Sequence, residues 1–136
     1  MKPSDLKRKK ALALYEVYRR GLEEGRFSSM RNAGDWVASQ PAPGYFIPAE
    51  KASLYMGMVQ SGMSLSGFSE SQRKLIRDLY RRYSEWMDAH PGNNLPRVCV
   101  MEEIVDSPAP EFYMTGEAAR KILRGVIRDV RRRHGW

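Results

Sequence analysis

Apolar residues recur at intervals of three and four positions in six segments of the chain, which is the spacing of one face of an α-helix. No segment shows the long alternation of apolar and polar residues that a half-buried β-strand requires. The pattern therefore predicts an all-α fold. The six predicted helices cover, in chain order, about residues 4–25, 29–40, 52–59, 69–89, 95–106 and 119–130.

Local signals mark several of the helix ends. Ser69 and Gln72 have the spacing of a capping box, in which each side chain binds the backbone amide of the other residue. Pro41 and Pro108 are expected to end the helices before them, because proline has no amide hydrogen to donate and restricts the residue that precedes it. Pro96 suits the first turn of the helix at 95–106.

The chain also contains an internal repeat. Residues 37–59 resemble residues 104–126 at a constant offset of 67, and both segments contain Pro-Ala-Pro followed by two adjacent aromatic residues. A shorter match, between residues 14–20 and 76–82, has an offset of 62. Such a repeat predicts two tandem, pseudo-symmetric units of three helices each. The predicted units are residues 1–63 and 68–136, joined by residues 64–67.

Positive charge is concentrated toward the two ends of the chain. The 136 residues have a net charge of +7. Residues 118–136 contribute +6 and residues 1–26 contribute +4, whereas residues 89–117 contribute −4. A concentrated positive surface attracts polyanions, chiefly nucleic acid.

The last predicted helix has one apolar side and one basic side. Arginine predominates over lysine there, which favours planar, bidentate contacts with phosphate or guanine. We therefore expect this helix to bind double-stranded DNA, with a second basic run near the N-terminus suited to the DNA backbone or a minor groove. The candidate DNA-binding residues are Arg120, Lys121, Arg124, Arg128, Arg131, Arg132, Arg133, Lys7, Arg8, Lys9 and Lys10.

A short helix followed by a basic helix resembles the helix-turn-helix class of DNA-binding proteins. The tandem Pro-Ala-Pro pattern is similar to small helix-turn-helix-like proteins of bacterial phages and mobile elements. The segments between the helices, residues 41–47 and 108–114, are longer than the usual turn of about three or four residues. The resemblance implies a regulator or accessory factor that binds DNA, and it assigns no roles to individual residues.

Two alternatives to DNA binding remain open. The helix at 52–59 has a neutral, methionine-rich side, which a protein partner would contact through Tyr55, Met56 and Met58. RNA binding would instead need exposed aromatic rings on which bases stack. The candidate rings are Tyr45, Phe46, Phe112 and Tyr113, for which packing in the core is favoured over pairing as short strands.

The sequence offers little for catalysis or metal binding. Its two histidines and its single cysteine lack neighbours at ligand spacing, so we expect no metal site, no cofactor and no enzymatic activity. Cys99 lies in an apolar segment and is expected to be buried. No apolar run reaches the roughly 18 residues of a membrane helix, and no signal peptide is visible, so the expected location is the cytoplasm. The oligomeric state is left open.

Overall fold

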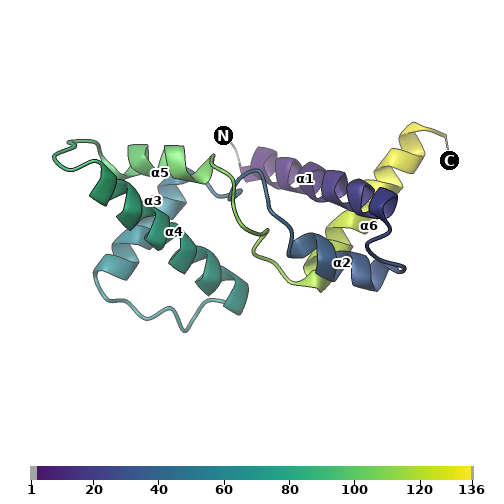
Figure 1. The fold of residues 1–136 in the computed structure, drawn as a ribbon, viewed down its shortest axis with the longest axis horizontal. Coiled ribbons are helices and arrows are strands. Elements are labelled where there is room, and N and C mark those ends of the chain that lie inside the picture. Colours follow the sequence, from purple (N-terminus) through teal and green to yellow (C-terminus); the bar gives the residue numbers. More distant parts are fainter. Residues whose placement is uncertain (1–2, 136) are drawn as a thin grey trace.

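The computed structural model describes residues 3–135, which form six α-helices and no strand (Figure 1). The prediction of an all-α protein is confirmed. Each predicted helix is present, with ends within a few residues of those expected. The helices are α1 (Pro3–Glu24), α2 (Met30–Ala38), α3 (Ala49–Gln60), α4 (Glu70–Ala89), α5 (Arg97–Val105) and α6 (Gly116–Arg133).

The helices pack in two groups that do not follow chain order. α6 packs against α1 and α2, whereas α3 packs against α4 and α5. Figure 1 shows these two bodies side by side, with two chain segments crossing between them. A helix-turn-helix would need contact between consecutive helices. Here α2 does not contact α3, and α5 does not contact α6. The expected grouping into residues 1–63 and 68–136 is therefore corrected, because each half gives its third helix to the other body.

The two crossing segments explain this exchange. Residues 39–48 and 106–115 are rich in proline, which keeps the preceding residues extended and prevents a tight turn back onto the same body. The segments run antiparallel and meet at an isolated bridge, where Ala42 and Ala109 each donate a backbone hydrogen bond to the other at 2.9 Å. The chain therefore passes from one body to the other twice at the same place.

Aromatic side chains fill the crossing. Tyr45 stacks on Tyr113 with ring centroids 5.8 Å apart, and Phe46 stacks on Phe112 at 6.1 Å. Phe46 is half-buried and the other three rings are buried, so packing of these residues in the core is confirmed. Phe46 and Tyr113 both have φ of 54°, a left-handed conformation that is uncommon for side chains of this size. Each of these two residues takes part in one of the two stacks.

Backbone hydrogen bonds on the two sides of the crossing come in matching pairs. The amide of Tyr45 donates to the carbonyl of Val105 at 3.0 Å, and the amide of Phe112 donates to the carbonyl of Ala38 at 3.2 Å. Tyr45 and Phe112 are 67 positions apart, as are Ala38 and Val105. The two hydrogen bonds therefore correspond to each other at the offset of 67 seen in the sequence.

Side-chain caps begin α2, α4 and α6, and the cap of α4 is the predicted one. Ser69 and Gln72 form the expected capping box at α4, with both hydrogen bonds present. Thr115 caps α6 by accepting a hydrogen bond from the amide of Ala118. Pro96 was predicted in the first turn of α5 but lies one residue earlier, at the N-cap position, and makes no side-chain cap hydrogen bond. The side chains of Ser69 and Thr115 satisfy amide groups that the helices themselves leave without partners.

Cys99 departs from the sequence-based expectation. The residue lies on α5 and is exposed, because the buried side of this helix is formed by Val100, Met101, Ile104 and Val105. Position 99 falls on the opposite side of the helix.

Within residues 3–135, no helix has the combination of length and apolar character needed to cross a membrane.

Candidate nucleic-acid interface

The arginine-rich segment at the C-terminal end is a folded helix. α6 buries Ala119 and Leu123 and half-buries the apolar residues that follow at helical spacing. These residues pack on α2 and α1, so the opposite side of α6 is turned to solvent. The helix continues to Arg133, with three arginines in its last turn, where the helix dipole favours positive charge.

Six of the seven predicted cations of α6 are exposed and unpaired. None of the six has an ion pair or a hydrogen bond to another part of the described chain. They are therefore available to an external anion without breaking an ion pair or hydrogen bond of the described chain. These residues are Lys121, Arg124, Arg128, Arg131, Arg132 and Arg133.

Arg120 is the exception and is corrected here. Its side chain is only 18% exposed, and its Nη1 donates to the carbonyl of Arg31 at 2.9 Å and lies 3.4 Å from the Asp35 carboxylate. The stem of Arg120 covers Gly34, where α2 and α6 approach closely. Arg120 therefore holds α6 on α2, and it does not face the solvent with the other cations.

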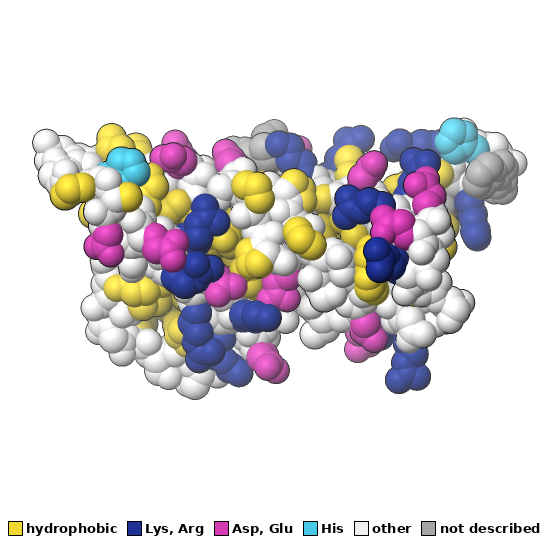
Figure 2. Space-filling view, viewed as in Figure 1, with side chains coloured by type: hydrophobic (Ala, Val, Ile, Leu, Met, Phe, Trp, Pro, Cys, Tyr) yellow, Lys and Arg dark blue, Asp and Glu magenta, His cyan; other side chains and the backbone are white. Residues whose placement is uncertain are grey.

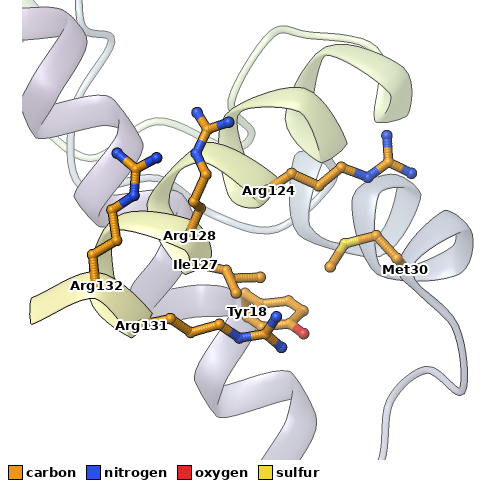
Figure 3. Close-up of a pocket in the computed structure, with 7 residues that line it drawn as sticks. All are labelled: Tyr18, Met30, Arg124, Ile127, Arg128, Arg131 and Arg132. Atoms are coloured by element: carbon orange, nitrogen blue, oxygen red, sulfur yellow. The ribbon is translucent and has the colours of Figure 1, made fainter. Parts of the chain in front are cut away.

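The exposed arginines surround a hollow between α6, α1 and α2 (Figure 3). The hollow has a volume of about 430 Å³. Tyr18 of α1, Met30 of α2 and Ile127 of α6 form its apolar floor. Its rim consists of Arg124, Arg128, Arg131 and Arg132. Guanidinium groups beside an apolar surface are suited to ligands that combine negative charge with a flat, weakly polar part.

A second hollow extends the basic surface onto α1. It has a volume of about 480 Å³ and is lined by Tyr15 and Arg19 of α1 and by Val130 and His134 at the end of α6. Arg19 was not among the predicted site residues, nor were the floor residues Tyr18 and Met30. The basic pair at 19–20 was visible in the sequence, but only the packing of α6 on α1 brings it beside the C-terminal arginines.

The N-terminal basic run does not join this surface. Lys9 lines a different hollow beside Pro43 and Phe46, near the crossing segments. Arg19, which lies beside α6, is ten residues further along α1, a rise of about 15 Å along the helix axis. The structure therefore separates Lys7, Arg8, Lys9 and Lys10 from the cations of α6. Lys10 is half-buried, and burial lowers its pKa.

Basic residues of α4 are largely engaged within the protein. Arg82 donates to Ser107 Oγ at 2.9 Å and to Tyr45 Oη at 3.3 Å. Lys74 lies 2.7 Å from a Glu111 carboxylate oxygen, and this contact raises the pKa of Lys74. Figure 2 shows basic and acidic side chains intermixed over this body. α4 therefore lacks the row of unpaired cations that α6 carries in the described part of the chain.

The residues proposed for other partners are mostly inaccessible. Tyr55 and Met56 are buried between α3 and its neighbours, and Met58 is half-buried, which corrects their expected role as a protein-binding surface. The aromatic rings proposed for RNA stack on one another at the crossing, and three of the four are buried. They do not form a platform on which bases could stack.

No group of three or more histidine, cysteine, aspartate or glutamate residues in the described part of the chain could hold a metal ion.

No protein family, curated protein or solved structure matches this chain. The candidate site is therefore defined by the geometry of α6, α1 and α2.

Proposed function

We propose that this chain is a non-enzymatic DNA-binding protein, a regulator or accessory factor, that holds the phosphate backbone of duplex DNA with α6. One observation carries the proposal: six cations line the solvent side of a folded helix, and none of them is neutralised by a carboxylate of the described chain. A surface of this kind is the electrostatic feature that proteins use to bind nucleic acids.

The spacing of the cations suits an extended row of phosphates. Lys121, Arg124, Arg128 and Arg132 follow one another at three, four and four positions, which places them on one side of α6. The row covers about 16 Å of the helix axis. The major groove of DNA is about 12 Å wide and admits an α-helix. Arginine adds bidentate contacts to phosphate or guanine, which lysine does not make.

The proposal includes a common origin for the two halves of the chain. The shared φ of Phe46 and Tyr113 and the paired hydrogen bonds at the crossing support a duplicated unit with exchanged third helices. Of the two third helices, only that of the second copy, α6, has an excess of basic residues. Positions 54, 57 and 61 of the first copy, which match Lys121, Arg124 and Arg128, are occupied by leucine, glycine and serine. Each chain would therefore have one DNA-binding face.

The salt dependence of DNA binding tests the proposal. Fluorescence anisotropy of a labelled blunt duplex, titrated with the protein at several salt concentrations, gives the slope of log affinity against log salt. If about five phosphates are neutralised, this slope is roughly −4.5. Absence of salt-sensitive binding would contradict the proposal.

A further inference from the structure

Contact with a phosphate row would leave the floor of the arginine hollow unused. Tyr18, Met30 and Ile127 are all half-buried, so each still presents part of its apolar surface to solvent. The volume of about 430 Å³ lies within the range of ligand sites. Phosphate groups are hydrophilic and gain nothing from an apolar floor. A ligand that fits both the floor and the rim of the hollow therefore combines a flat or apolar part with negative charge.

The arginines around the hollow have two orientations (Figure 3). Arg128 and Arg132 point away from the floor, toward the solvent side of α6. Arg124 extends on the side of Met30, and Arg131 extends on the side of Tyr18. The outer pair is placed to bind phosphates that pass along α6. The inner pair borders the floor with planar groups of the kind that stack on nucleic-acid bases.

We propose that this hollow binds an unpaired nucleotide, with its base against Tyr18, Met30 and Ile127 and its flanking phosphates on Arg128 and Arg132. The inference rests on the proposed function and names the form of DNA that the site prefers. Bases within a duplex are stacked on their neighbours and do not reach the floor, whereas the bases of a single-stranded tail do. The preferred ligand is therefore duplex DNA with a single-stranded tail.

Charge complementarity favours this ligand over an acidic peptide with an apolar side chain. The cations extend beyond the hollow in both directions along α6, to Lys121 on one side and Arg133 on the other. A continuous phosphate backbone would use the whole row. A peptide anchored by one side chain would leave much of it unused.

The test compares three DNA probes at one ionic strength by fluorescence anisotropy. The probes are a blunt duplex, the same duplex with a short single-stranded tail, and the same duplex with an abasic tail of equal length. The abasic tail supplies the same additional phosphates without bases. We expect the tail with bases to bind about fivefold or more tighter than the abasic tail, since base stacking on a protein surface has at least this effect.

A floor variant provides a second measurement. Met30→Gln is expected to abolish the preference for bases in the tail, so that the tailed duplex and the abasic-tailed duplex bind with nearly equal affinity. Leu54→Gln, an apolar-to-polar change on the exposed side of α3, is the matched control and should retain the preference. The ratio of two affinities from one preparation does not depend on the fraction of protein that is folded.

Each further outcome has a defined meaning. Equal binding of the two tails would overturn the inference, while salt-sensitive binding of the blunt duplex would still support the proposed function. Binding of an acidic, leucine-containing peptide that depends on Met30, without any preference for bases, would overturn the inference in favour of a protein partner. Failure of all three probes to bind would refute both proposals.

Discussion

Arg120 of α6 and Asp35 of α2 lie 3.4 Å apart across the interface between the two helices, although 85 positions separate them in the chain. The same guanidinium donates to the carbonyl of Arg31. Asp35 is mostly exposed, so the ion pair itself contributes little, whereas the packed stem of Arg120 and its hydrogen bond to the backbone contribute more. The contact fixes how the basic face of α6 is presented.

We expect Arg120→Met to reduce the free energy of unfolding by about 1 kcal/mol, because the variant retains the stem but loses the hydrogen bond to Arg31. DNA affinity, corrected for the folded fraction, should change by no more than about threefold, as expected for a residue that does not contact phosphate. Urea unfolding and anisotropy measure the two quantities. A large loss of DNA affinity at unchanged stability would show instead that Arg120 contacts DNA directly.

The close approach of α2 and α6 provides a second stability prediction. A Cβ atom at Gly34 would lie 2.4 Å from the carbonyl oxygen of Gly116 and 2.4 Å from Cγ of Arg120. The backbone of α6 would have to move, so we expect Gly34→Ala to reduce the free energy of unfolding by about 1–3 kcal/mol. The displacement of α6 should weaken DNA binding as well. Thermal unfolding followed by circular dichroism measures the first effect.

Gly125 provides the matched control on α6 itself. Nothing lies within 4 Å of a Cβ atom at this position. Gly125→Ala should therefore stabilise the protein by roughly 0.5–1 kcal/mol, through the higher helix propensity of alanine. Destabilisation by both variants to a similar degree would argue against the packing of α2 on α6.

The helices could be predicted from the sequence because their signals are local. The capping box of Ser69 and Gln72 and the apolar stripes depend only on residues within a few turns of one another. The antiparallel meeting of Ala42 and Ala109 could not be predicted in this way. It depends on whether each third helix packs on its own half of the chain or on the other half. The apolar stripes of α3 and α6 have the same spacing, so they do not distinguish these two arrangements.

The candidate site was predictable only in part, for the same reason. The basic side of α6 follows from helical spacing, so Lys121, Arg124 and Arg128 were found. The internal role of Arg120 was not found, because Asp35 meets it only through the exchange of helices. Tyr18 and Met30 likewise belong to the first half of the chain and reach the hollow through packing that the sequence pattern does not specify.

The Tyr113–Asp78 hydrogen bond predicts a loss of stability in alkali. Tyr113 Oη donates to a carboxylate oxygen of Asp78 at 2.5 Å, and burial, this hydrogen bond and the charge of Asp78 raise the pKa of Tyr113 well above its ordinary value. The unfolded chain loses this proton near pH 10, whereas the folded chain retains it. The stabilisation is therefore complete below about pH 10 and decreases above it, by up to about 1.4 kcal/mol per pH unit.

Urea unfolding between pH 8 and pH 11 measures this effect. Tyr113→Phe should remove the part of the alkaline loss that this hydroxyl causes and should lower stability at pH 8, since the hydrogen bond to Asp78 is absent. Tyr80→Phe, on the same helix as Asp78, leaves the Tyr113–Asp78 pair intact and should behave as the unmodified protein does. An unchanged alkaline slope in Tyr113→Phe would show that the hydroxyl does not cause it.

Charge reversal on α6 tests the DNA-binding face most directly. Arg124 and Arg128 are exposed and four positions apart, and neither has an ion pair among residues 3–135. The double variant Arg124→Glu with Arg128→Glu should weaken duplex binding by about tenfold or more and should reduce the magnitude of the salt slope by about 2, because two phosphate contacts are lost. Its unfolding temperature should stay close to that of the unmodified protein, because neither side chain is part of the core.

α4 supplies a control with the same change in charge and the same spacing. Arg77 and Arg81 are exposed and four positions apart, and Arg81 has only an exposed partner, Glu85, at 3.1 Å. Reversing both to glutamate changes the net charge by the same amount but leaves the row on α6 intact. If binding depended only on net charge, the two double variants would lose affinity equally. A loss confined to the α6 variant would instead locate the phosphate contacts on that helix.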